Sequence, residues 1–544
     1  MWWQIILSVV LASFTAFYFY IRHKMSYWKR MGVTEDPGTF PFGSKHMIDF
    51  LTRRIAFVQM TDHAYKSYPD APIVGTYDMF GSPSIVIRDL DIAKQILIKD
   101  FDKFMERKPS HSSNAYNLDS KNNRYLPFML TELRGDQWKR VRASLTPAFT
   151  SGKLKSMVSL IHGIAGHCSG FLEKKIGESF EAKELMQNFA MDVIVSTGFG
   201  YECDSLNDRS NIFKKNAELM VGKSFNLKMV IIIFLLLFFP RVLRWLDLPF
   251  LNREAEQFFA AAIMKAIKER QESGEKRNDF IDICTDILKK EVEEIDSQFT
   301  KNQPIKDSTA SELSDDRKSQ KQQISEKGAR KEEIERILIS NSLLMFLAGF
   351  DTVSSSTAII FYFLAKNPDC QERLYQEIAD AVKVAGTEEL DYAGVMNLPY
   401  MEMFFQESLR MYPLTHLERA SNTAYKIPGT EITLPKDLLV RFPAPSIVKD
   451  PKYFPNPEVF NPENFTAANK NARHPLASGG FGHGPRNCIA QRFATMEGKI
   501  VVARILHKYR ILPCDKTVDK LIPDPKSRSQ QPKGEVWIKV ELRS

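Results

Sequence analysis

The chain has 544 residues, of which 44% are hydrophobic and 26% are charged, so it can build a large core. This balance argues against a disordered chain and against a polytopic membrane protein. The net charge of +8 is spread along the sequence, and no Lys/Arg run with interleaved aromatic residues indicates a nucleic-acid partner. Six widely spaced cysteines without a C-x-x-C pair argue against zinc ribbons, iron–sulfur clusters and a disulfide framework, and favour a reducing compartment.

Residues 1–20 contain no charged side chain and are predicted to form a membrane anchor. As a helix with a rise of ~1.5 Å per residue they reach ~30 Å, the thickness of the hydrocarbon core. The basic cluster that follows places the body of the protein in the cytosol. A cleaved signal peptide is the alternative, but the segment lacks a basic first region and a small-residue cleavage site. We expect an anchor over 1–21, a basic and proline-containing linker over 22–45, and one large domain over 46–544.

The large domain is predicted to be mainly α-helical, with small β-sheets at its edges. Apolar periodicity indicates helices over 88–100, 136–148, 153–175, 180–197, 253–272 and 276–294. Strands are predicted at 73–77 and 84–87 and in a hairpin over 423–434.

Two further segments have an unusual composition. Residues 300–331 are almost free of large apolar side chains, which predicts a solvated loop. Residues 229–240 form an apolar run that is too short to span a bilayer and that Pro240 is expected to stop. This run is either a buried core helix or a lip that dips into the membrane surface.

The densest motif is FGHGPRNCIA, which surrounds a lone cysteine, Cys488. Glycines at positions 479, 480, 482 and 484 allow the loop to fold tightly around a flat group, and Arg486 provides a cation two residues before the thiol. A helix that begins just after Cys488 would favour the thiolate. A thiolate as the sole protein ligand suits a haem iron. The alternative is a buried structural thiol.

This motif resembles the haem-binding loop of the cytochrome P450 superfamily. Phe481, Gly484, Arg486 and Cys488 match the family's pattern, and Ala490 stands where the family has glycine. The resemblance implies haem b with Cys488 as its axial ligand, in a mainly α fold with small β-sheets.

The apolar stretch over 332–366 is predicted to be a central helix, and its segment AGFDT resembles the family's oxygen-activation motif. The resemblance implies that Ala348 and Gly349 leave room for dioxygen. It also implies that Thr352 and Asp351 relay protons to the site. The alternative is an isolated Asp-Thr pair that caps or bends a helix.

Glu407 and Arg410 match the family's Glu-x-x-Arg pair, which the resemblance implies is buried and structural rather than a surface ion pair. The usual third partner is an arginine in Pro-Glu-Arg-Phe, but this chain has Asn464 there. Asparagine cannot pair bidentately with a carboxylate. Either the triad is weaker than in the family, or a neighbouring residue replaces the arginine.

Trp138 and Arg142 match the family's Trp-x-x-x-Arg, and one helical turn brings both side chains within reach of a haem propionate. The resemblance implies a second propionate ligand at Arg419. Arg107 is a further candidate for this role, with Lys108 as an equal choice.

The five motifs occur in family order, and the sequence most resembles insect microsomal members that act on drugs, plant toxins or insecticides. The resemblance implies a monooxygenase of the endoplasmic reticulum membrane. It would insert one oxygen atom of O2 into a lipophilic xenobiotic, insecticide or endogenous lipid or hormone. NADPH–cytochrome P450 reductase is the expected electron donor, with cytochrome b5 as an optional second partner.

Two other functions stay open at this point, a reductase-independent haem-thiolate isomerase or dehydratase and a non-catalytic haem or lipid carrier. The substrate is not readable from the sequence. We expect the pocket walls to come from residues 109–128, from 223–250 and from the central helix near 345–350.

Overall fold

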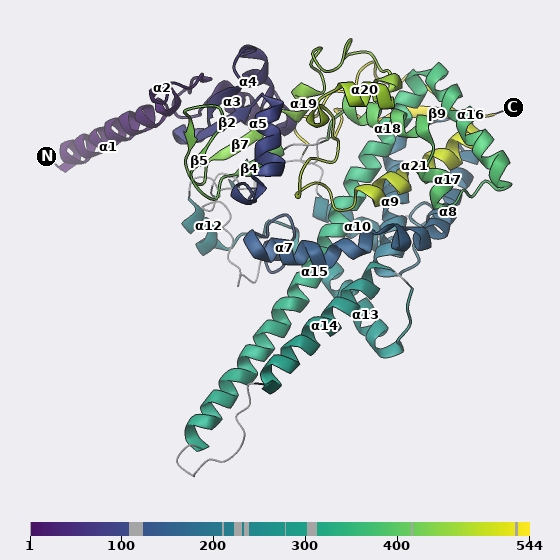
Figure 1. The fold of residues 1–544 in the computed structure, drawn as a ribbon, viewed down its shortest axis with the longest axis horizontal. Coiled ribbons are helices and arrows are strands. Elements are labelled where there is room, and N and C mark those ends of the chain that lie inside the picture. Colours follow the sequence, from purple (N-terminus) through teal and green to yellow (C-terminus); the bar gives the residue numbers. More distant parts are fainter. Residues whose placement is uncertain are drawn as a thin grey trace.

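Figure 1 shows the fold in a computed structural model, which describes residues 2–107, 123–208, 211–221, 231–232, 235, 239–277, 279–301, 313–414, 417–527 and 531–543. Helices make up most of it, and three small sheets lie among them. The prediction of a mainly α fold with small β-sheets is therefore confirmed.

Most of the body is built from helices that pack around α15 (Leu313–Lys366). They are α7 (Gly135–Leu145), α8 (Ser151–Glu173), α9 (Ala182–Phe199), α10 (Ile212–Val221), α13 (Arg253–Ser273), α14 (Phe280–Lys301), α16 (Pro368–Ala385), α17 (Tyr392–Met396), α18 (Pro399–Met411) and α21 (Gln491–Lys508). Helix α1 (Trp2–Lys24) is a long helix at the N-terminus. The remaining helices are short: α2 (Tyr27–Arg30), α3 (Lys45–Leu51), α4 (Asp62–Ser67), α5 (Leu90–Lys94), α12 (Pro240–Leu246), α19 (Ala444–Ile447) and α20 (Ala467–Ala472).

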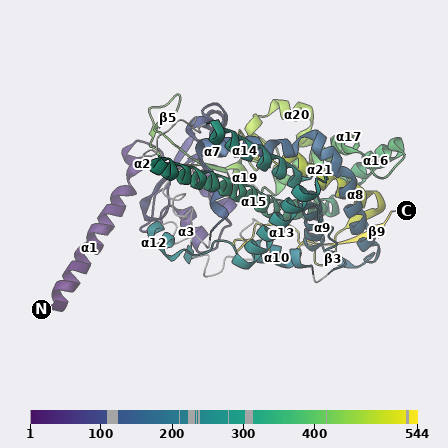
Figure 2. The ribbon, with the colours of Figure 1, turned by 90° about the horizontal axis from the view of Figure 1, so that it is seen from below.

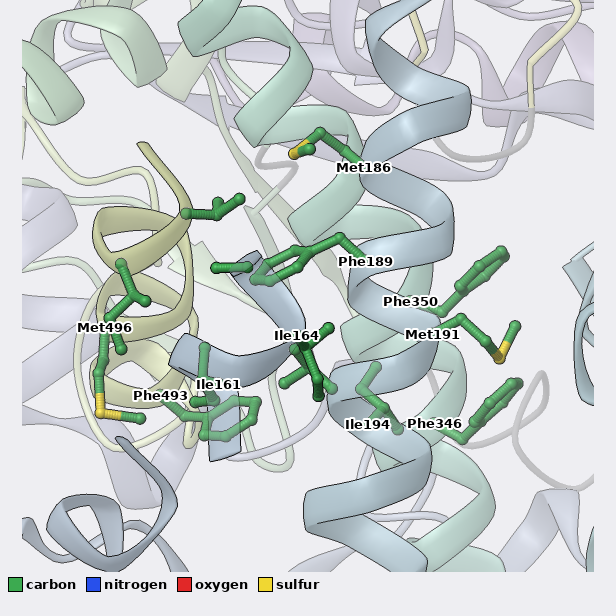
Figure 3. Close-up of a cluster of buried hydrophobic side chains, with 14 of the residues drawn as sticks. Ile161, Ile164, Met186, Phe189, Met191, Ile194, Phe346, Phe350, Phe493 and Met496 are labelled. Atoms are coloured by element: carbon green, nitrogen blue, oxygen red, sulfur yellow. The ribbon is translucent and has the colours of Figure 1, made fainter. Parts of the chain in front are cut away.

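The centre of the core is the contact between α9 and α15. Helix α9 is apolar on nearly all sides and is almost wholly buried. Figure 3 shows Phe189 and Ile194 of α9 lying between Phe346 and Phe350 of α15 on one side and residues of α8 and α21 on the other. The rings of Phe346 and Phe350 are stacked, with centroids 6.1 Å apart. This packing holds the buried C-terminal half of α15 in place.

The helix ends follow ordinary capping chemistry. The side chain of Asn252 accepts a hydrogen bond from the backbone N–H of Ala255 at the start of α13. Helix α16 begins at Pro368 and ends before Gly386, which has φ of +68°. These local signals explain why the predicted helices begin and end close to where the structure has them.

The largest sheet has the strand order β1-β2-β7-β4, with β1 (Ile73–Tyr77), β2 (Pro83–Ile87), β4 (Leu417–Ala420) and β7 (Leu439–Phe442). β1 and β2 are antiparallel, with Ile73 opposite Ile87, and β2 runs parallel to β7. A second sheet has the order β3-β9-β8, with β3 (Ser179–Glu181), β8 (Tyr509–Leu512) and β9 (Trp537–Leu542). The predicted hairpin is present as β5 (Tyr425–Lys426) and β6 (Thr433–Leu434).

One prediction about an irregular segment was wrong. The solvated loop expected over 300–331 is helical from Leu313 onward, because its many Lys, Gln, Glu and Arg residues are good helix formers even though they cannot form a core. Phe239 is not helical, and Pro240 begins a new helix, α12, because proline is well suited to the first helical turn. Most of 229–240 and residues 302–312 lie outside the described residues.

Helix α1 projects from one end of the molecule (Figures 1 and 2). Within the described residues, α1 and the segment Glu326–Lys366 of α15 are long and apolar enough to cross a membrane. The second is largely buried in the protein, as expected of a core helix, whereas α1 is almost wholly exposed. Residues 22–45 pack against the first sheet, with Trp28 fully buried there.

Candidate active site

A cavity of about 930 Å³ lies between α15 and the loop that precedes α21. Its volume is within the range of small-molecule and cofactor sites. It brings together predicted site residues from five separate segments of the chain: Arg107, Trp138, Arg142, Ala348, Gly349, Thr352, Arg419, Phe481, Arg486 and Cys488. Of the predicted walls, the stretch near 345–350 contributes, but the described parts of 109–128 and 223–250 do not line it.

The Cys488 loop is closed by its own backbone. The backbone N–H of Cys488 donates to the carbonyl of Phe481 at 2.9 Å, and that of Asn487 donates to the carbonyl of Gly484 at 3.0 Å. Gly484 has φ of +72°, and a Cβ at this position would lie 2.0 Å from the carbonyl oxygen of Leu97. Glycine is therefore required at 484 both for the turn and for the close approach of the neighbouring backbone.

Arg486 attaches this loop to the rest of the protein. Its Nε, Nη1 and Nη2 atoms donate to the backbone carbonyls of Met105, Leu130 and Leu133 at 3.0, 3.1 and 2.8 Å. The guanidinium also lies 4.1 Å from the ring centroid of Trp138. Burial, followed by repulsion from Arg107, lowers the pKa of Arg486 to about 9. Arg486 thus lines the cavity while its donors position the loop.

The thiol of Cys488 faces the cavity. Burial raises its pKa above the ordinary value, whereas the backbone N–H of Ala490 and the guanidiniums of Arg142 and Arg107 act in the opposite direction. Helix α21 begins directly after Ala490, so its positive end also lies near the sulfur. Ala490 has φ of −95°, a conformation that any residue adopts. Alanine in place of the family's glycine therefore causes no backbone strain.

Helix α15 presents Ala348 and Thr352 to the cavity opposite this loop. The Thr352 hydroxyl donates to the carbonyl of Ala348 one turn earlier, at 2.5 Å. Gly349 also lines the cavity, but a Cβ there would lie 2.6 Å from Ile194 of α9. The small side chain at 349 therefore serves the close packing of α9 against α15 as well as the space in the cavity.

The structure does not bring Asp351 to the cavity. Its carboxylate is buried and lies 3.3 Å from the ammonium of Lys183 in α9, and it accepts a hydrogen bond from Gln531 at 2.9 Å. Burial lowers the pKa of Lys183, and Asp351 opposes this effect. The side chains of Asp351 and Thr352 therefore point in different directions, as those of adjacent residues on a helix do. A role for Asp351 in proton transfer stays a prediction.

Buried arginine side chains line the cavity, and some of their donor nitrogens have no acceptor there. Within the described part of the chain, Nε of Arg107 and both Nε and Nη2 of Arg419 have no hydrogen-bond partner. Burial, followed by repulsion from Arg107, lowers the pKa of Arg419 to about 9. Arg142 has a partner in the side chain of Asn487, at 2.8 Å. An anionic group in the cavity would satisfy these guanidiniums, as the two propionates of a haem do. Lys108 lies outside the described residues.

The residues present therefore fit a haem: a thiol directed into the cavity, a glycine-dependent loop beside it, and donor nitrogens of Arg107 and Arg419 that have no acceptor among the described residues. A sequence model of the family "Cytochrome P450" matches residues 52–538. This chain belongs to the cytochrome P450 family.

Curated relatives from insects extend this result over the full length. Cytochrome P450 6k1 of Blattella germanica is 31% identical, over 94% of this chain and 92% of its own. Cytochrome P450 6B1 of Papilio polyxenes is 30% identical over 99% of both chains. Cytochrome P450 6B7 of Helicoverpa armigera is 28% identical, over 100% of this chain and 99% of its own. The resemblance to insect cytochromes P450 and the expectation of a monooxygenase are thereby confirmed.

In this cytochrome P450 the Glu407–Arg410 pair is buried. Nε of Arg410 donates to Oε2 of Glu407 at 2.7 Å and Nη2 donates to Oε1 at 2.8 Å, which is a bidentate pair. Asn464 is part of the one-turn helix η7 (Pro462–Phe465) and donates its amide to Oε1 of Glu407 at 3.2 Å. Asn464 therefore keeps the family's contact with Glu407 but adds no positive charge.

Arg473 supplies a cation near this pair. It donates to the carbonyls of Tyr453 and Asn464 at 2.9 and 2.8 Å, and its guanidinium lies 3.8 Å from the ring centroid of Phe454. Burial lowers the pKa of Arg473, and the charge of Glu407 opposes this effect. These contacts place a cation close to the pair, but they are made to backbone carbonyls and a ring and not to Glu407 itself, so the two alternatives that the sequence left open both stay predictions.

Sequence reasoning missed two asparagines that join distant segments of the chain, and one of them, Asn341, lines the cavity. Asn341 of α15 accepts from the backbone N–H of Leu130 at 2.8 Å and donates to the carbonyl of Phe128 at 3.1 Å. Asn123 donates to the carbonyl of Leu248 and accepts from the N–H of Phe250, both at 2.9 Å. These residues belong to no local motif, because their partners are more than 100 positions away in the sequence.

Glu256 of α13 is a further buried group that sequence reasoning missed. It is buried, and the backbone N–H of Tyr125 donates to its carboxyl. Burial raises the pKa of Glu256 to about 7, and the Tyr125 contact only partly offsets this effect. No sequence signal distinguishes Glu256 from other glutamates of the same helix.

We expect Gly484→Ala to prevent the Cys488 loop from closing, because the new methyl group would overlap the carbonyl of Leu97. Gly429→Ala is the matched control, since Gly429 has φ of +76° and a methyl group there would meet no heavy atom within 4 Å. The control should lose only ~1–2 kcal/mol of unfolding free energy, from backbone strain. The Gly484 variant should lose clearly more and should retain little haem, as measured by thermal unfolding and haem content. Equal losses would contradict the steric argument.

We expect Arg473→Met to lower the free energy of unfolding by ~2–4 kcal/mol, because it removes two charged hydrogen bonds and a ring contact. Adding Asn464→Arg in this background should recover part of the loss by returning a cation to Glu407. Arg492→Met, at an exposed position of α21, is the control. If the Arg473 and Arg492 variants unfold alike in chemical denaturation, Arg473 does not support the buried pair.

We expect Glu256→Gln to remove a pH dependence of stability. The folded-state pKa of Glu256 lies above its ordinary value of 4.5, so its contribution is complete below pH ~4.5 and is lost as the pH rises through about 7. The variant should match the wild type near pH 5 and exceed it near pH 8 by up to ~3 kcal/mol, at ~1.4 kcal/mol per pKa unit. Denaturant titrations at both pH values check this, and an unchanged difference between them would contradict it.

Proposed function

We propose that this cytochrome P450 is a membrane-anchored haem-thiolate monooxygenase of the endoplasmic reticulum. It inserts one atom of O2 into a lipophilic small molecule, with electrons from NADPH delivered through NADPH–cytochrome P450 reductase. The observation that carries the proposal is the thiol of Cys488 facing a large cavity, in which Nε of Arg107 and Nε and Nη2 of Arg419 have no acceptor among the described residues. The candidate substrates are xenobiotics, insecticides and endogenous lipids or hormones.

Each predicted site residue has a distinct task in this proposal. Cys488 would bind the haem iron through its thiolate, and Arg107, Arg419, Arg142 and Trp138 would hold the propionates. The bound haem supplies the activation of O2 and the oxidation itself. The protein supplies the ligand, the fixed position of the haem and a cavity that excludes water.

Thr352 is a polar residue of α15 that lines the cavity and would hold a proton at Oγ1 for transfer. Asp351 would take part only after its carboxylate leaves Lys183, because it now lies away from the cavity. Apolar residues on either side of Thr352, including Met345 and Val353, would line the space for the substrate. This lining supports a lipophilic substrate class and selects no single compound.

Exposed cations near the Cys488 loop support an electron-donating partner with an acidic surface. Arg140 of α7 and Arg492 in the first turn of α21 are both exposed. Both lie on elements that meet the loop, since Arg142 of α7 bonds Asn487 and α21 follows Cys488 directly. A reductase that binds there, with cytochrome b5 as an optional second partner, would reach the haem over a short distance.

The membrane location rests on α1 and on the segment around α12. Trp245 of α12 is 82% exposed, and three apolar neighbours on the same short segment are also exposed: Phe239, Val242 and Leu246. Such a surface is costly in water and favourable at a membrane. Three of these four residues lie after the run 229–240, so the lip interpretation of that run stays a prediction. A lipophilic substrate would then reach the protein from the lipid phase.

The decisive experiment is the reduced carbon monoxide difference spectrum of the purified full-length chain. We expect the shifted Soret band of a thiolate-ligated haem, and we expect Cys488→Ala to abolish it because no other thiol lines the cavity among the described residues. Cys203→Ala, at a thiol far from the cavity lining, should leave the band unchanged.

NADPH oxidation with added reductase then separates the three functions. A monooxygenase forms oxygenated product in step with NADPH oxidation, an isomerase or dehydratase turns over without reductase, and a carrier does neither. An unaltered thiolate band in the Cys488 variant would overturn the assignment of the ligand.

A further inference from the structure

A second, much smaller cavity of about 10 Å³ lies beside the large one. It is found where α8, α9, α14, α15 and α21 meet η6 (Thr146–Phe149), the one-turn helix that follows α7. We refer to this space as the side pocket. Its lining includes six apolar side chains: Ala148, Phe149, Met157, Phe280, Met345 and Phe493.

The side pocket is a poor place for water. Thr197 of α9 is the one polar side chain among the described residues that line it, and its hydroxyl already donates to the carbonyl of Val193 at 2.6 Å. A water molecule there would therefore find at most one acceptor, the oxygen of Thr197. Buried waters typically make about three hydrogen bonds, and apolar cavities without such partners stay dry.

The side pocket adjoins the large cavity. Five residues line both spaces: Phe149, Thr197, Phe280, Met345 and Phe493. Met345 lies seven positions before Thr352 on α15, which is two turns or ~10 Å along the same face at a rise of ~1.5 Å per residue. A small molecule that leaves the side pocket past these shared side chains enters the large cavity close to Thr352.

The size and chemistry of the side pocket select a small apolar molecule. Its volume of about 10 Å³ is near the minimum of ~10–15 Å³ that one water-sized molecule requires, so a lipophilic substrate is too large for it. Dioxygen is small and nonpolar, and it loses no hydrogen bonds when it leaves water. The thioethers of Met157 and Met345 are polarisable, and their flexible side chains can adapt to such a guest.

We propose that the side pocket is a binding site for dioxygen, which is held there before it enters the large cavity near Thr352. The inference rests on the proposed monooxygenase function, because that reaction consumes O2. Ala148 and Met157 line the side pocket but are not part of the large cavity's lining. The side pocket can therefore be altered at these two positions without a change in the lining of the haem site.

The test uses the full-length holoenzyme and two probes. Diffraction from crystals pressurised with xenon locates bound xenon atoms, because xenon is an apolar, polarisable probe of dry cavities. Flash photolysis of the reduced carbon monoxide complex measures how fast a small diatomic molecule recombines from solution. The reduced carbon monoxide difference spectrum of each sample is recorded first, to show that the haem and its thiolate ligand are in place.

We expect xenon in the side pocket of the wild type. Ala148→Val should fill the pocket, exclude xenon from it and slow carbon monoxide recombination several-fold. Met157→Leu is the matched control, because this exchange nearly conserves side-chain volume and should leave both measurements unchanged. Met157→Phe fills the pocket from α8 instead, and it provides the same comparison if Ala148→Val folds poorly.

Two outcomes would overturn the inference. Absence of xenon from the side pocket of the wild type would show that it binds no small apolar molecule. Bound xenon together with equal recombination rates in the filled and control variants would show a void that plays no part in the passage of O2. Failure of the proposed function looks different, because the thiolate band would then be missing from the wild-type spectrum before either probe is applied.

Discussion

The attachment of the Cys488 loop by Arg486 is the interaction on which the site depends. One guanidinium stacks on Trp138 and bonds three backbone carbonyls that belong to two other segments of the chain. A charged group held this way in a buried place is stable only if every donor has an acceptor. Because Arg486 is two residues from Cys488, its fixed position determines where the sulfur lies relative to α15 and hence the geometry of the cavity.

Much of this fold could be predicted from the sequence because it is encoded locally. Strand β1 and helices such as α8 and α9 are continuous apolar or amphipathic stretches of the sequence, and Glu181 caps the start of α9. The motifs also identified the polar and small residues that the cavity brings together, because each motif is short and rests on residue types with a specific chemistry. The errors have the same origin. A polar stretch excludes a core but permits a helix, so composition alone could not predict the outer third of α15.

What the sequence could not provide were the contacts between distant segments. Asp351 is adjacent to Thr352, yet its direction depends on Lys183 in another helix. Arg473 reaches the neighbourhood of the Glu407–Arg410 pair through the carbonyl of Asn464, nine positions earlier and in a different turn. Asn341 and Asn123 join distant segments only because folding places backbone groups of remote residues beside them. Such roles follow from tertiary distances and have no local pattern.

The packing of Phe40 and Phe80 on α1 has a practical consequence for protein production. Deletion of the anchor to obtain soluble material would expose the rings of Phe40 and Phe80 beside Phe42, which is already exposed. The three rings would form an apolar surface patch that promotes aggregation of the folded body. Polar substitutions at these three positions, made along with the deletion, would give a better behaved chain for crystallisation than truncation alone.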